Sequence, residues 1–151
     1  MALAEHNKKT EYQGSHHLSV FKWYSASDIG MSALAADGTH NSSWIPCAGY
    51  NQATVMVRFY NPTGDATSGN LTFNIEISHD KSTAYGLQTA STSSGAVTLS
   101  DVNYTKDTAN AAVDFAVDFP LNYKYFRIAN LTVASGHANE DVDVEVNLGK
   151  I

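Results

Sequence analysis

Three consecutive residues, Ser78, His79 and Asp80, have the side chains of a hydrolytic catalytic triad. A triad depends on geometry, however, and residues adjacent on a strand point to opposite faces. The sequence also lacks the G-x-S-x-G turn that presents a nucleophilic serine in many hydrolases. We therefore assign no nucleophile to this tripeptide, and we expect a protein that is not an enzyme.

Histidines and acidic residues are numerous enough to raise the question of a metal site. No HExxH or His-x-His pattern occurs, and His16 and His17 are adjacent. Residues 139–143 (Asn-Glu-Asp-Val-Asp) carry oxygen ligands suited to calcium but lack the spacing and glycine of an EF-hand loop. We expect solvated residues in both cases and predict no catalytic, cofactor-binding or metal-binding residue. The histidines are His6, His16, His17, His40, His79 and His137.

The lone cysteine and the aromatic residues have plain structural interpretations. Cys47 follows Pro46 in a short apolar run, which favours a buried, unreactive thiol. The eight Tyr, six Phe and two Trp can fill a β-sheet core, or stack on sugars where they are exposed. The candidates for exposed sugar platforms are Trp23, Tyr24, Trp44, Tyr60 and Tyr85.

Composition and charge exclude some classes of partner. The 151 residues suit one domain, and 9 Lys+Arg against 15 Asp+Glu give a net charge of −6, which argues against nucleic-acid binding. No apolar run approaches the length of a membrane-spanning helix, so we expect no membrane contact. Residues 5–13 are polar where a secretory signal would be apolar, which predicts synthesis in the cytoplasm without export.

The elements that must position these residues are strands. Residues 70–78, 113–119 and 142–148 alternate strictly between apolar and polar side chains, as half-buried antiparallel strands do. Weaker strand patterns cover 20–24, 44–47, 53–60, 84–89, 96–100 and 124–133. The apolar phase of the last segment switches at Ala129–Asn130, which predicts a β-bulge. The segment 26–37 suits either a short helix or a loop.

These patterns predict an all-β antiparallel sandwich of Greek-key or jelly-roll type over residues 18–151, with a closed barrel as the alternative. Residues 1–17 are polar and without periodicity, which predicts an extended N-terminal arm. The predicted core is Val55, Val57, Phe73, Ile75, Ile77, Phe115, Val117, Phe126, Ile128, Val144 and Val146.

Two segments are similar to those of known β-sandwich proteins. Residues 71–80 (LTFNIEISHD) run from an alternating strand into Ser-x-Asp, and residues 120–130 (PLNYKYFRIAN) join a proline to an aromatic pair and Arg-Ile. This combination resembles small sandwich proteins of tailed-phage virions and, more distantly, discoidin-like modules. The lone Cys47 departs from the disulfide-closed discoidin pattern.

The resemblance implies a capsid decoration or cement protein, located in the virion, that binds the major capsid protein or another virion protein. Such proteins are often trimers, so a homo-oligomer is expected, and the arm would add a strand to a neighbour's sheet edge. Two alternatives remain open. One is a carbohydrate- or receptor-binding module, and the other is a minor tail or head–tail component of the same fold.

Overall fold

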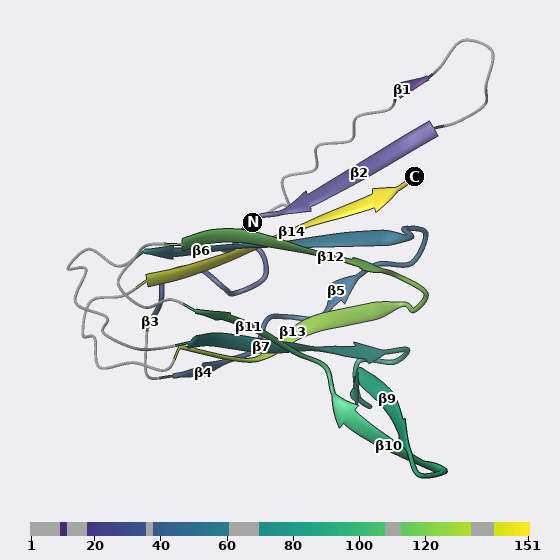
Figure 1. The fold of residues 1–151 in the computed structure, drawn as a ribbon. Coiled ribbons are helices and arrows are strands. Elements are labelled where there is room, and N and C mark those ends of the chain that lie inside the picture. Colours follow the sequence, from purple (N-terminus) through teal and green to yellow (C-terminus); the bar gives the residue numbers. More distant parts are fainter. Residues whose placement is uncertain (1–9, 12–17, 36–37, 61–69, 108–112, 134–140) are drawn as a thin grey trace.

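The computed structural model describes residues 10–11, 18–35, 38–60, 70–107, 113–133 and 141–151. The predicted all-β antiparallel fold is confirmed, because two sheets of antiparallel strands pack face to face around one apolar core (Figure 1). The two sheets do not join into the closed barrel that was the alternative. Among the described residues, no helix is long and apolar enough to cross a membrane.

The first sheet has the strand order β1–β2–β14–β6–β12. Its long central strands are β14 (Asp141–Lys150) and β6 (Gln52–Tyr60), with β12 (Val113–Pro120) at one edge. At the other edge, β2 (Leu18–Tyr24) and β3 (Leu34–Ala35) pair with opposite ends of β14. The short β1 (Thr10–Glu11) extends this edge by pairing with the start of β2.

The second sheet is centred on β7 (Asn70–Ser78) and β13 (Tyr125–Val133). On the side of β13 away from β7, the strand pairs with β4 (Thr39–His40) and β5 (Ile45–Pro46). On the side of β7 away from β13, the strand pairs with β8 (Tyr85–Gly86) and β11 (Asn103–Asp107). A separate two-stranded hairpin, β9 (Gln88–Ser93) and β10 (Ala96–Asp101), is inserted between β8 and β11.

The connectivity is that of a jelly roll. The chain leaves the first sheet after β3, enters the second for β4 and β5, and returns for β6. It then crosses to β7, β8 and β11, and continues by crossing at every step through β12, β13 and β14. The long strands β2, β6, β7, β12, β13 and β14 therefore pair with strands distant in sequence, and the two sheets enclose a core between them.

Alternation accounts for the core. Eight of the eleven predicted core residues are buried, while the other three, Ile77, Phe115 and Val117, are half-buried and pack against the core. Phe115 and Val117 lie on β12, which has a sheet neighbour on one side only, so less of the molecule covers them. The predicted bulge is confirmed, because the β7–β13 register shifts after Ala129 and Asn130 adopts a φ of 52°.

In three regions the structure differs from the sequence predictions or adds to them. Of the two structures considered for residues 26–37, the helix is wrong, because turns lead from Ala26 into β3; residues 36–37 lie outside the described part. The strand β11 was not predicted, and of β9 only residues 88–89 fall within the predicted strand 84–89. Within the predicted arm only Thr10–Glu11 is described, and it pairs with β2 of the same chain.

Candidate functional site

Ser78 and Asp80 build a turn at the end of β7 instead of a nucleophilic site. The Ser78 hydroxyl accepts the backbone N–H of Lys81 at 2.9 Å and lies 3.1 Å from a carboxylate oxygen of Asp80. That carboxylate accepts the backbone N–H groups of Thr83 and Ser82. These hydrogen bonds hold the pKa of Asp80 well below its usual range, and the bond from the Thr83 N–H has the largest effect on that pKa. The His79 side chain is exposed and takes no part in the hydrogen bonds described for this turn.

The thiol of Cys47 is buried, as the sequence predicts. Its Sγ donates to the carbonyl oxygen of Tyr123 at 3.2 Å. Burial raises the pKa of this thiol to about 12, so it is protonated at neutral pH. A protonated, enclosed thiol is a poor nucleophile and a poor metal ligand.

The residues considered for metal binding are not brought together in the described part of the chain, where no three His, Cys, Asp or Glu side chains cluster. The ring of His40 contacts the carbonyl oxygen of Ala35. Asp143 accepts the backbone N–H of Ala33 at 2.7 Å. Asn139 and Glu140 lie outside the described residues, as do the histidines His6, His16, His17 and His137.

The five candidate sugar platforms have different environments. Tyr24 is buried and does not form a platform, because the alternation of β2 points it into the core beside Val146. Trp23 is half-buried, and its indole N–H donates to Glu145 at 3.0 Å on the outer face of the first sheet. Tyr85 is exposed, and Trp44 is half-buried. The side chain of Tyr60 lies outside the described part.

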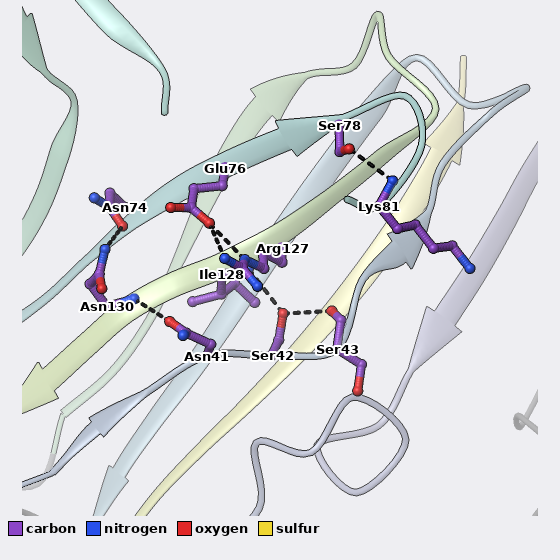
Figure 2. Close-up of polar contacts among 10 residues, drawn as sticks. All are labelled: Asn41, Ser42, Ser43, Asn74, Glu76, Ser78, Lys81, Arg127, Ile128 and Asn130. Carbon is purple, nitrogen blue, oxygen red and sulfur yellow. Dashed lines mark hydrogen bonds and ion pairs between the residues drawn. The ribbon is translucent and has the colours of Figure 1, made fainter. Parts of the chain in front are cut away.

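Trp44 contacts a polar cluster on the outer face of the second sheet, and Figure 2 shows Glu76 and Arg127 of that cluster. The guanidinium of Arg127 lies 4.6 Å from the centre of the Trp44 ring and makes a 2.6 Å ion pair with Glu76. Arg127 and Glu76 face each other because they are register partners on β13 and β7. Both side chains are mostly shielded from water, so the pair is screened less than a surface ion pair.

Three asparagines continue this face towards the bulge, as Figure 2 shows. The side-chain oxygen of Asn41 accepts the backbone N–H of Asn130, whose side-chain amide in turn donates to Asn74. The left-handed backbone of Asn130 turns its N–H towards Asn41, and asparagine tolerates that conformation better than most residues. The face therefore presents amide, guanidinium and indole groups over β4, β7 and β13.

An open hollow of about 390 Å³ lies on the outer face of the first sheet. Its rim carries one guanidinium and three carboxylates, and Arg58 and Asp114 are loosely paired at 3.8 Å with both side chains largely exposed. Such a pair in water contributes little to stability. The hollow is lined by Met56, Val57, Arg58, Asp114, Phe115, Ala116, Asp143 and Glu145.

The hairpin β9–β10 is the third surface feature, and Figure 1 shows it extending away from both sheets. All twelve of its strand residues are exposed. Ser94 and Gly95 form the tip, both with positive φ, as a two-residue type I′ turn requires. Val97 and Leu99 are 67% and 65% exposed, although large apolar residues usually find cover.

Sequence analysis did not anticipate the hairpin or the Arg127–Glu76 pair. The Ser-Gly step at 94–95, flanked by residues that favour strands, was the available signal for the hairpin. The ion pair joins positions 51 residues apart, so it required the register of β7 and β13. The two segments on which the virion-protein resemblance rests overlap these same two strands. Searches for similar proteins gave no matching family model and no matching curated protein.

Proposed function

We propose that this chain is a non-enzymatic structural protein of a tailed-phage virion, a decoration or cement protein that binds and stabilises the outer capsid lattice. The observation that carries the proposal is the projecting β9–β10 hairpin, because its exposed Val97 and Leu99 are not covered by any other element of the described chain. Apolar side chains held out on a projecting ribbon suit a protein contact.

Charge supports a protein partner on the outside of the particle. The net charge of −6 opposes contact with packaged DNA, which leaves the major capsid protein or another virion protein as the partner. Repeated weak contacts on a lattice add up, so each copy needs only a small attachment surface. We expect a homo-oligomer, with a trimer favoured, and an arm over residues 1–17 that pairs with a neighbouring sheet edge.

The direct test is labelling of particles. An antibody against the chain should decorate capsids in virions purified from the source lysate, and quantitative mass spectrometry should give a fixed copy number per particle. Deletion of residues 1–17 should abolish capsid binding while the circular dichroism of the sandwich is retained. Absence of the chain from purified particles would refute the proposal, and labelling confined to the tail would favour the minor tail component.

A second function is favoured by the outer face of β7 and β13. The amides of Asn74, Asn130 and Asn41, together with the Trp44 ring under Arg127, offer the donors, acceptors and flat surface that sugars use. If this face binds a glycan, Asn74→Ala should abolish binding on a glycan array. Asn147→Ala, a matched change on the outer face of the other sheet, should leave binding intact. Equal loss in both variants, or no bound glycan, would contradict a sugar site here.

A further inference from the structure

We propose that the β9–β10 hairpin binds a second copy of this chain, with the apolar face of each hairpin packed against the same face of the other. This inference rests on the proposed function and deepens it by naming the first partner of the hairpin. The apolar face is defined here as Ala90, Thr92, Val97 and Leu99.

The register of the hairpin places these four side chains together. Val97 is the cross-strand partner of Thr92, and Leu99 is that of Ala90, so the two pairs lie side by side on one face of the ribbon. The opposite face carries only small residues, among them Ser91, Thr98 and Ser100. The hairpin is therefore two-sided, with its two large apolar residues, Val97 and Leu99, on the side that would pack.

The hairpin lacks the support that an isolated ribbon needs. A two-stranded hairpin alone in water is marginally stable, and a third strand or a packed face is required for more. No residue of β9 or β10 is buried. Packing two such faces against each other, as two sheets of a sandwich do, would cover Val97 and Leu99 and order the ribbon.

Charge points to a copy of the same chain as the occupant. Every copy carries a net charge of −6, so two copies repel each other over most of their surfaces. Within β9 and β10, by contrast, the only charged side chain is Asp101, which lies at the base of the hairpin on the same face as Leu99 and accepts a hydrogen bond from Gln88. Residues 89–100 are uncharged, so two hairpins that overlap through Val97 and Leu99 towards their tips keep like charges apart. The strands also lack the lysines and prolines that protect many exposed edges from other chains.

The test is the mass of the full-length chain by light scattering and sedimentation over a wide range of concentration. Wild type should form a dimer, or a larger oligomer assembled from such pairs. The double variant Val97→Thr/Leu99→Thr keeps strand-favouring residues and should weaken association by about tenfold or more. The matched control Thr98→Ser/Ser100→Thr changes the opposite face and should associate as wild type does.

Folding is checked separately, because the hairpin contributes nothing to the core. At concentrations low enough for the wild type to be monomeric, both double variants should keep the wild-type urea midpoint, so a lost oligomer cannot be ascribed to unfolding. A wild-type chain that stays monomeric, or a control variant that loses association equally, would overturn the inference.

Failure of self-association can also be distinguished from failure of the proposed virion function. A monomer whose Val97→Thr/Leu99→Thr variant is lost from virions would mean that the hairpin binds the capsid, which refutes self-association and supports the virion role. An oligomer that depends on the hairpin but is absent from particles would support self-association and refute the virion role.

Discussion

The hydroxyl of Ser42 holds the edge of the second sheet at a point where no strand pairing is available. Ser42 lies between β4 and β5, which pair with opposite ends of β13. Its backbone N–H donates to the carbonyl of Ile128 at 2.9 Å, and its Oγ accepts the N–H of Ile128 at 3.0 Å. Both residues are buried, so Ser42→Ala would leave the Ile128 N–H without an acceptor in a dry environment.

The expected cost follows from that orphaned donor. Leaving a buried N–H unsatisfied costs about 1–3 kcal/mol. For a chain of this length each kcal/mol lowers the Tm by about 2–4 °C, so Ser42→Ala should lower the Tm by ~2–12 °C. Urea unfolding followed by tryptophan fluorescence gives the free energy of unfolding directly, and the m-value should not change.

The neighbouring residue provides the control. Ser43 is exposed, and it contributes backbone groups to the described hydrogen bonds, including the carbonyl that accepts from the Ser42 hydroxyl. Ser43→Ala should therefore change the free energy of unfolding by no more than about 0.5 kcal/mol. If Ser42→Ala and Ser43→Ala were equally stable, the argument that the Ser42 side chain satisfies Ile128 would be wrong.

Three further predictions concern other residues. The pKa of Asp80 is lowered in the folded chain, so the stabilisation by its carboxylate is complete above about pH 4 and is lost as the pH falls below that. Asp80→Asn should therefore reduce the decrease of the urea midpoint between neutral and acidic pH. A variant whose midpoint depends on pH as that of the wild type does would contradict this. Because burial raises the pKa of Cys47 to about 12, a thiol reagent at neutral pH should label it only after unfolding; rapid labelling of the native chain would show that the thiol is accessible. Phe126 is buried with its ring edge-on to Phe119, so Phe126→Ala should lower the free energy of unfolding by about 3–5 kcal/mol, whereas Val97→Ala should leave it almost unchanged. Equal losses of free energy in the two variants, measured by chemical denaturation, would contradict the division between core and hairpin.

The strands best predicted from the sequence are those with one face against the core and the other face in water. The alternation in β7, β12 and β14 is forced by a buried face and a wet face, so it can be read without knowing any partner. The bulge at Asn130 was predicted for the same reason, since it shifts the phase of burial. The strand patterns left Greek-key and jelly-roll connectivity both open and gave no strand register, because these depend on pairs far apart in the chain.

The candidate sites were harder to predict because their members meet only through register. Trp44, Glu76 and Arg127 are separated by tens of residues, and none has a sequence pattern of its own. Tyr24 was considered as a platform because the sequence alone does not show which face of a short aromatic strand is inward. The hairpin was missed because neither face of β9 is buried, so burial left no alternation to detect.

The composition that concealed the hairpin also bears on its proposed role. A ribbon of serine and threonine stays hydrated before assembly, while two apolar residues on one face provide a weak contact that repetition on a lattice can strengthen. Because the hairpin packs on no core element, stability and assembly should be separable. A core change such as Phe126→Ala should lower the free energy of unfolding without altering the association of the folded chain, and Val97→Thr/Leu99→Thr should do the reverse. If the hairpin only connected β8 to β11, Val97→Thr/Leu99→Thr would leave association unchanged.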